Sequence, residues 1–201
     1  MNSVRARPRG ETMAENRAKL IAAARRAFAT KGFAAASMDD LTKEVGLTRG
    51  ALYHNFGDKA GLLRAVVAEI DGEMAARARQ LAGRASTDWD ELLVEGAAYI
   101  EMALDPEVRR IVLLDGPAFL GDPSRWPSQN ECLNLTKQAV QKLVLDGVMT
   151  AVDVEAAARL LNGAALNAAL WVAASEEPHL TLPKAVEAFQ LLATGLLANR
   201  S

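Results

Sequence analysis

Residues 37–63 contain the side chains whose types and spacing point most clearly to chemistry. Arg49 carries a planar fork of N–H donors that fits either the edge of guanine or a phosphate group. Gly50 lets the backbone come close to a bound molecule, and a phenol, an imidazole and an ammonium follow within ten residues. The segment predicts a surface for double-stranded DNA, with candidate contacts at Ser37, Thr42, Thr48, Arg49, Gly50, Tyr53, His54 and Lys59.

Two short helices joined by a tight turn must position these side chains. Ser37 can cap a helix over residues 38–45, and Gly46 supplies the left-handed residue that ends it. Thr48 caps a second helix that reaches about residue 55, and Gly57 ends that helix in turn. This order of caps and breakers predicts a helix-turn-helix, whose second helix enters the major groove of DNA.

Several of these residues also have a structural interpretation that the sequence leaves open. Tyr53 can pack against its neighbours, Thr48 can serve only as a cap, and Arg49 can bind a base or a phosphate. Lys59 lies in the first turn of the next helix, where free backbone N–H groups and an ammonium together suit a phosphate. Ser37 and Thr42 are candidates for contacts with the other strand's backbone.

Charge is distributed unevenly along the 201 residues. The net charge is −2, but residues 1–60 carry +5 and residues 61–201 carry −7, so the basic end coincides with the helix-turn-helix. The single Cys132 cannot form an internal disulfide, which favours a reducing compartment. No signal peptide and no membrane-spanning run is visible, so we expect a soluble, cytoplasmic protein with no membrane partner.

Over roughly residues 17–66 the chain resembles the TetR family of bacterial transcriptional regulators. The resemblance rests on Ala24, Phe28, Gly32, Phe33, Leu41, Val45, Gly46, Leu47, Thr48, Gly50, Leu52, Tyr53, Phe56, Lys59, Leu62 and Leu63. Leu41-Thr42 stands where the family usually has Ile-Ala, a conservative departure. The segments 113–118 and 160–164 resemble those of one TetR subgroup with a helical C-terminal domain.

The resemblance implies a regulator that binds a palindromic operator as a homodimer. Repression is the commoner role in the family, and release by a small apolar inducer is the expected response. It also implies a phosphate contact for Tyr53 and a phosphate or base contact for His54. The alternative is a DNA-binding dimer that ignores ligands because its C-terminal core is closed.

Abundant Ala and Leu with few Gly and Pro favour an all-α fold. We expect a basic tail without fixed structure over residues 1–11, which is either solvated or an arm that touches DNA. A helix-turn-helix domain follows over 12–57, and a ligand-binding and dimerisation domain over 58–201. A long helix joins the two, and we place helices at about 13–31, 58–81, 88–103, 106–114, 128–147, 152–175 and 182–199, with an irregular segment at 116–127.

Two helices near the end of the chain are the expected dimer interface. The first holds ten alanines between residues 151 and 174, and small residues let helices approach closely. The second has an apolar face wider than one partner helix needs, although both faces could be internal core. The interface candidates are Leu160, Gly163, Ala164, Val186, Phe189 and Leu196.

Large side chains in the C-terminal region are candidates for lining an inducer cavity, although aromatic residues at helical spacing are more often plain core. These candidates are Tyr99, Met102, Phe119, Trp126, Leu135, Asn167 and Trp171. An enzyme is not expected, because the chain has no Gly-x-Ser-x-Gly, phosphate loop or metal-ligand cluster, and Cys132 has no obvious base partner. We therefore predict no catalytic residue, no metal and no cofactor.

Overall fold

The computed structural model describes residues 9–198, and it confirms the all-α fold. Apart from one isolated bridge between Met149 and Leu197, the regular structure in this range is helical. The chain divides into two compact units, with the boundary between Val67 and Ala68. Each unit is described by itself.

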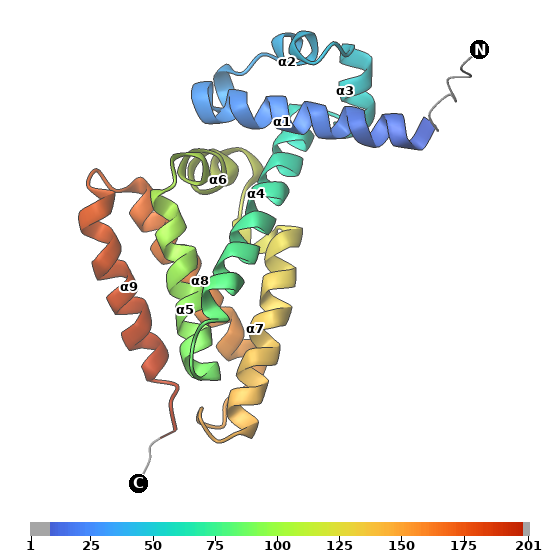
Figure 1. Ribbon diagram of the computed structural model, residues 1–201. Coiled ribbons are helices and arrows are strands. Elements are labelled where there is room, and N and C mark those ends of the chain that lie inside the picture. The colour runs from blue at the N-terminus through green and yellow to red at the C-terminus, as the bar shows by residue number, and fades with distance from the viewer. Residues whose placement is uncertain (1–8, 199–201) are drawn as a thin grey trace. The chain divides into compact units, whose positions relative to one another are not determined.

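The first unit is built from α1 (Arg9–Ala35), α2 (Met38–Glu44), α3 (Arg49–Phe56) and the start of α4 (Lys59–Ala82) (Figure 1). The expected stop at Gly32 is a break with a φ of 77°, after which helical turns resume as far as Ala35. Of the tail expected over residues 1–11, residues 9–11 lie in α1, and residues 1–8 lie outside the described range.

A small apolar core holds the helices of the first unit together. Leu20, Phe28, Leu41 and Leu52 come from α1, α2 and α3, and each is fully or almost fully buried. Burying one such side chain stabilises a fold by about 1.5–3 kcal/mol. An ion pair of 2.6 Å between Arg26 Nη2 and a Glu44 carboxylate oxygen also links α1 to α2 at the surface.

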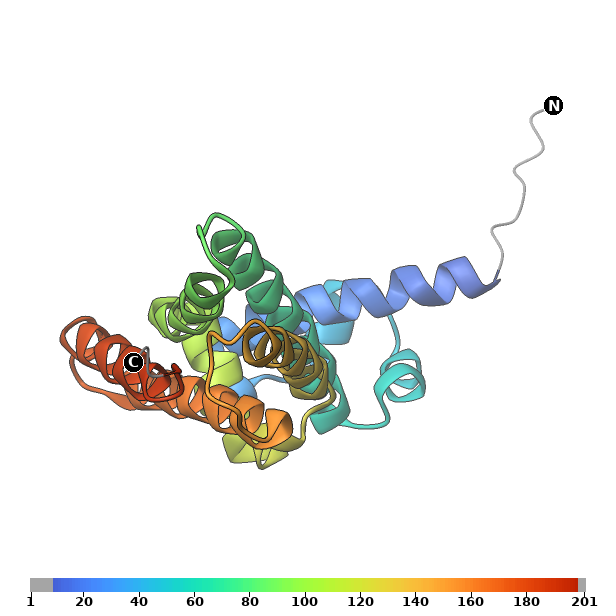
Figure 2. The same ribbon diagram turned by 90° about the horizontal axis from the view of Figure 1, so that it is seen from below.

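The second unit contains the rest of α4 and a helical bundle (Figures 1 and 2). In it α8 packs against α5, α7 and α9, and α9 lies along the edge of the unit. The elements after α4 are α5 (Asp88–Glu101), η1 (Met102–Leu104), η2 (Val108–Asp115), α6 (Gly116–Leu120), η3 (Pro123–Arg125), α7 (Pro127–Leu145), α8 (Val154–Ala174) and α9 (Pro178–Thr194).

Two expectations for this unit were wrong about where a helix starts, and in both cases a proline lies in the first turn of the helix. The segment predicted as irregular from residue 116 begins with the short helix α6, in which Pro117 occupies the first turn. The last helix begins at Pro178, four residues before the expected start, and ends at Thr194 rather than residue 199. Proline fits a first helical turn because the N–H it lacks has no partner there in any helix.

The chain between α7 and α8 and the chain after α9 lie side by side. The Thr150 N–H donates to the Leu196 carbonyl at 2.9 Å, and the Ala198 N–H donates to the Val148 carbonyl at 2.9 Å. Met149 between them is buried in a cluster with Leu143 of α7 and Ala158 of α8. Across the described residues, none of the helices has the length and apolar character needed to cross a membrane.

Candidate functional site

The outer face of α3 is the part of the first unit with a surface suited to DNA. The Thr48 hydroxyl accepts a hydrogen bond from the Ala51 N–H at 3.2 Å and so fixes the start of the helix. Leu52 on the inner face is fully buried. The opposite face exposes Arg49, Gly50, Tyr53 and His54 together, as the sequence predicted.

Arg49 is held by neighbours although it is exposed. Its Nε lies 3.1 Å from an Asp39 carboxylate oxygen of α2, and its guanidinium carbon lies 6.0 Å from the centre of the Tyr53 ring. A hydrogen bond with Tyr53 and the charge of Asp39 raise the pKa of Arg49, so the guanidinium stays charged. Arg49 is thereby aligned on the exposed face before any partner arrives.

Lys59 lies at the first turn of α4, as expected, but its ammonium already has a partner. The Nζ atom donates to the Ala34 carbonyl at 3.1 Å and lies 4.7 Å from the centre of the Phe33 ring. Partial burial lowers the pKa of Lys59. The side chain therefore joins the start of α4 to the end of α1, whatever else it binds.

Thr42 does not offer its hydroxyl to a partner, unlike Ser37, which is exposed and caps α2. Only 3% of Thr42 is exposed, and its hydroxyl donates to the carbonyls of Met38 and Asp39, 3.1 and 3.0 Å away. We remove Thr42 from the candidate DNA contacts because its side chain is satisfied inside the unit.

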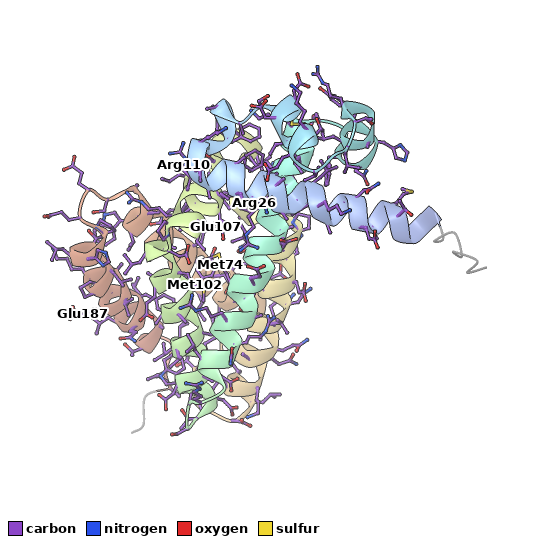
Figure 3. All side chains as sticks on the ribbon, turned by 45° about the horizontal axis from the view of Figure 1, so that its top comes forward. Arg26, Met74, Met102, Glu107, Arg110 and Glu187 are labelled. Carbon is purple, nitrogen blue, oxygen red and sulfur yellow. The ribbon has the colours of Figure 1, made fainter. Side chains whose placement is uncertain are left out.

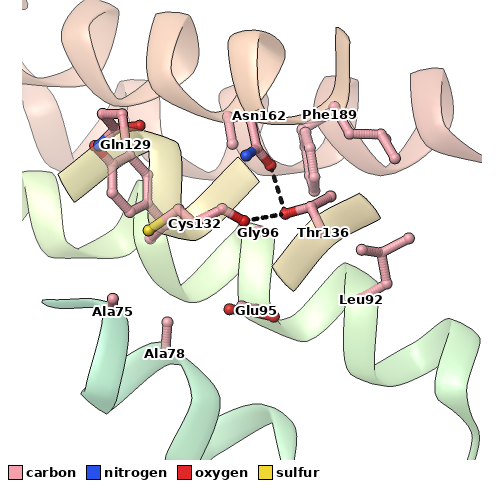
Figure 4. Close-up of a pocket in the computed structure, with 13 residues that line it drawn as sticks. Ala75, Ala78, Leu92, Glu95, Gly96, Gln129, Cys132, Thr136, Asn162 and Phe189 are labelled. Atoms are coloured by element: carbon pink, nitrogen blue, oxygen red, sulfur yellow. Dashed lines mark hydrogen bonds between the residues drawn. The ribbon is translucent and has the colours of Figure 1, made fainter. Parts of the chain in front are cut away.

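The second unit contains a cavity of about 70 Å³ among α4, α5, α7, α8 and α9 (Figure 4). Its apolar walls come mainly from small residues, with a few larger side chains. They are Ala75, Ala78, Leu92, Gly96, Leu161, Ala165 and Phe189. Six polar residues complete the lining, and they are Glu95, Tyr99, Gln129, Cys132, Thr136 and Asn162.

Three of these six polar side chains, those of Gln129, Thr136 and Asn162, have hydrogen-bond partners. The Thr136 hydroxyl lies 2.9 Å from the side-chain oxygen Oδ1 of Asn162 and 3.0 Å from the Cys132 backbone carbonyl oxygen, both marked in Figure 4. The Gln129 amide donates to both carboxylate oxygens of Asp71, at 3.1 and 3.3 Å. In contrast, the Tyr99 hydroxyl is fully enclosed and makes no hydrogen bond of full geometry, although the Gln129 side chain is near enough to lower its pKa against the larger effect of burial.

Asp71 is the buried charge of α4, with only 1% of its surface exposed. Burial raises the pKa of this carboxyl group, and hydrogen bonds with Ser128 and Gln129 oppose that rise. Since Gln129 also lines the cavity, a single amide connects the cavity to α4.

The seven residues predicted to line an inducer site lie in different parts of the second unit. Of these, Tyr99 lines the cavity described above. Met102, labelled in Figure 3, is buried in η1 and is not part of this lining, and Trp126 is buried against Gly116. Phe119 and Trp171 are exposed. Neither Leu135 nor Asn167 lines the cavity, and Asn167 is exposed on α8. Small lining residues such as Gly96 and Ala75 carried no sequence signal of a site.

A mostly apolar stripe, interrupted by Asn167, runs along one side of α8. Leu160 is 74% exposed, and Gly163, Ala164, Asn167 and Trp171 follow at spacings of three and four residues on the same side. A side chain at Gly163 would meet nothing within 4 Å in the single chain. This stripe contains three of the residues predicted for a dimer interface.

On α9 the exposed apolar residues are Leu180, Leu191 and Leu192, and Glu187 on the same helix points away from the unit (Figure 3). The predicted interface residue Phe189 instead turns inward, where it is almost fully buried and its ring lies against Gly96. Val186 and Leu196 are half-buried. The composition of α9 does not show which of its leucines face inward and which face outward, because that depends on how the helix is rotated against its neighbours.

Helix α3 is exposed, is capped by Thr48 and lies on a small helical unit, and the second unit is also helical. These features are those of a helix-turn-helix transcriptional regulator. Residues 20–66 match the model for bacterial regulatory proteins of the tetR family, and residues 89–196 match the model for the tetracyclin repressor-like C-terminal domain. The chain belongs to the TetR family, as its resemblance implied, and it is a regulator with a DNA-binding helix-turn-helix.

Solved structures and curated relatives agree with this assignment. A TetR-family transcriptional regulator from Pectobacterium atrosepticum is 46% identical, with a TM-score of 0.85, over 95% of this chain and 98% of that one. FadR from Bacillus subtilis, solved with stearoyl-CoA, shares the fold with a TM-score of 0.68 at 17% identity, over 89% of this chain and 98% of that one. The regulator TtgR from Pseudomonas putida is 33% identical over 50% of this chain and 49% of that protein, so the chain spans about half the length of such curated relatives.

Proposed function

We propose that this protein is a homodimeric repressor that binds a palindromic operator through α3 and leaves it when a small ligand occupies the second unit. The observation that carries the DNA-binding part is the exposed face of α3, on which Arg49, Gly50, Tyr53 and His54 lie together. In this assignment residues 12–57 bind DNA, and residues 58–201 bind the ligand and the second copy.

The contacts divide by chemistry. Arg49 begins α3, and its fork of donors suits guanine O6 and N7, whereas Tyr53 and Lys59 suit phosphate oxygens. Thr48, Gly50 and His54 complete the reading surface, and Ser37 at the start of α2 is placed for a phosphate of the other strand. Contacts with phosphates fix the position of the DNA-binding unit on the duplex, and contacts with bases determine which DNA sequence it binds.

Dimerisation is supported by the mostly apolar stripe on α8 and the leucines of α9. Exposed apolar surface of this kind marks interaction sites in proteins. Paired α8 and α9 helices from two copies would bury Leu160, Trp171 and Leu191 in a four-helix bundle, with Gly163 allowing a close approach. Two reading helices would then meet half-sites about 34–36 Å apart along DNA.

Ligand response is supported by the cavity and by its connection to α4. The amide of Gln129 lines the cavity and also donates to Asp71, so a ligand that takes over this amide changes the hydrogen bonding of α4. Helix α4 contributes residues to both units. Ligand binding thus favours one position of α4 over another, which is a shift between populated states.

The test begins with selection of bound duplexes from a random DNA pool by the full chain. Fluorescence anisotropy on the selected duplex then compares the wild-type protein with Arg49→Ala and with Lys137→Ala, a control on α7 in the other unit. We expect a twofold symmetric consensus, weaker binding by Arg49→Ala and no change in the control. Failure to select any duplex at low salt would refute the proposal, and selection of unpaired half-sites would refute its dimeric part.

A further inference from the structure

The cavity in the second unit has an unusual balance of charge. Among its lining residues Glu95 is the one ionisable carboxylate, and the lining contains no lysine, arginine or histidine. No hydrogen bond or ion pair with a described residue engages the Glu95 carboxylate. Burial raises the pKa of Glu95, the charge of Arg79 on α4 opposes that rise, and the charge of Glu91 adds to it. An anionic ligand would enter this cavity without a compensating charge.

Two oxygen-bearing groups of the lining make no hydrogen bond of full geometry, and both lie on α5. Glu95 and Tyr99 are four residues apart on α5, so they share one side of the helix. The Tyr99 hydroxyl is enclosed and makes no hydrogen bond of full geometry, and a poorly satisfied buried polar group is costly. A carboxylate accepts hydrogen bonds only, and a phenol can also accept one, so a ligand that donates several hydrogen bonds satisfies both.

Two ionisable groups in the wall of this cavity, Cys132 and Tyr99, have raised pKa values. Burial, together with the charges of Asp71, Glu95 and Glu131, raises the pKa of Cys132 to about 11 against the opposing effect of Arg79. The same Asp71 charge acts on Tyr99, whose pKa burial already raises far above its ordinary value. Burial is the main cause of both shifts and the carboxylate charges add to it, so a negative charge on either of these two groups is disfavoured.

The size of the cavity limits the ligand. A water molecule needs about 10–15 Å³ of such space, so about 70 Å³ accommodates five or six waters. At roughly 30 Å³ of liquid volume per water, that is about the volume of one six-membered ring with a short substituent. The walls that would surround the ring are apolar, with Leu92, Leu161 and Phe189 as the large side chains.

We propose that this cavity binds a small organic cation, namely an amine with a single apolar ring. Its ammonium donates to Glu95 and to the oxygen of Tyr99, and its ring lies against Leu92, Leu161 and Phe189. An ammonium has three donors and no acceptor, which matches the two acceptors on α5. The inference names the ligand class of the site proposed above, and its effector role rests on that proposed function.

Three probes of one shape test the charge directly. Isothermal titration calorimetry at pH 7 compares benzylammonium, benzyl alcohol and benzoate on the ligand-free full chain. We expect benzylammonium to bind at least tenfold more tightly than either of the others, and Glu95→Gln to abolish that preference. Tyr99→Phe should weaken benzylammonium several-fold. Glu101→Gln is the control, because Glu101 is an exposed carboxylate of α5 that does not line this cavity.

Equal or tighter binding of benzoate or benzyl alcohol would overturn the proposal. So would the absence of benzylammonium binding at about 10 millimolar, which is roughly the weakest affinity that is useful to measure. Unchanged affinity in Glu95→Gln, with the fold confirmed by circular dichroism, would also overturn it. Operator binding is measured separately, without any probe. If the protein does not bind an operator, the proposed regulator function is refuted, and the result on ligand binding in the cavity is unaffected. Amine binding without operator release would keep the site and remove its effector role.

Discussion

Adding one methyl group at Gly96 tests how tightly α5 and α9 pack beside the cavity. A Cβ at this position would lie 2.3 Å from Cζ and 2.5 Å from Cε1 of Phe189. Carbon atoms in contact are about 3.5–4.0 Å apart, so in Gly96→Ala the ring must move by more than about 1 Å. Since Phe189 also lines the cavity, the free space open to the displaced ring is the cavity itself.

Gly72→Ala supplies the reference that isolates this clash. Gly72 lies in α4, and a Cβ there would meet nothing within 4 Å. Both variants gain the same helix propensity, about 1 kcal/mol for alanine over glycine. The difference between them is therefore the overpacking, for which we expect about 1–3 kcal/mol. For a chain of this length each kcal/mol corresponds to about 2–4 °C in Tm.

Differential scanning calorimetry at one fixed protein concentration measures both melting temperatures, because a dimer's Tm depends on concentration. We expect Gly72→Ala to melt at or above the wild type and Gly96→Ala to melt below Gly72→Ala. A shorter side chain in Gly96→Ala/Phe189→Leu should recover part of the loss. If Gly96→Ala melts with Gly72→Ala, the ring does not occupy the position described, and the argument from packing fails.

Four further variants and one control variant test the remaining parts of the molecule. Leu191→Glu should shift the dimer toward monomers in sedimentation velocity, whereas Leu145→Glu, at a still more exposed leucine outside α8 and α9, should not; equal behaviour would exclude this interface. Lys59→Ala should lower the salt slope of DNA binding by about one, and Arg49→Ala should cost about 1–3 kcal/mol at particular base positions; a uniform loss for Arg49→Ala would place it on phosphate. The folded-state pKa of Asp71 lies above its ordinary 3.8, so the native protein binds the extra proton and its stability falls as pH rises from 3.8 through the folded pKa. Asp71→Asn should lose this fall, and parallel pH–stability curves for the two proteins would contradict the assignment.

The reading head was predictable because its signals are local. Ser37 and Thr48 accept the cap hydrogen bonds expected of them, from the N–H groups of Asp40 and Ala51. Gly46 and Gly57 both have positive φ, which only glycine adopts without strain, so the ends of α2 and α3 followed from residue type. Thr42 was misjudged because a hydroxyl can return to its own helix, and composition does not reveal that choice.

The cavity was not predictable in the same way, because it forms where side-chain volume is missing. Gly96, Ala75 and Ala78 leave space between helices distant in sequence, and no pattern along one helix records that space. Large aromatic residues drew attention instead, and Trp171 lies on the outside of α8. In an alanine-rich helix both faces look alike, so the side that meets a partner is decided only by tertiary packing.

The carbonyl groups at the C-terminal end of α8 accept hydrogen bonds from an arginine of another segment. Arg109 of the π-helical turn η2 donates through Nε to the Ala173 carbonyl at 2.7 Å and through Nη2 to the Ser175 carbonyl at 3.3 Å. A positive charge also complements the negative end of the helix dipole. Because a guanidinium does not titrate in the physiological range, these hydrogen bonds persist at any pH at which Asp71 or Glu95 gains a proton. Acidification can therefore alter the interior of the bundle while the end of α8 keeps its anchor.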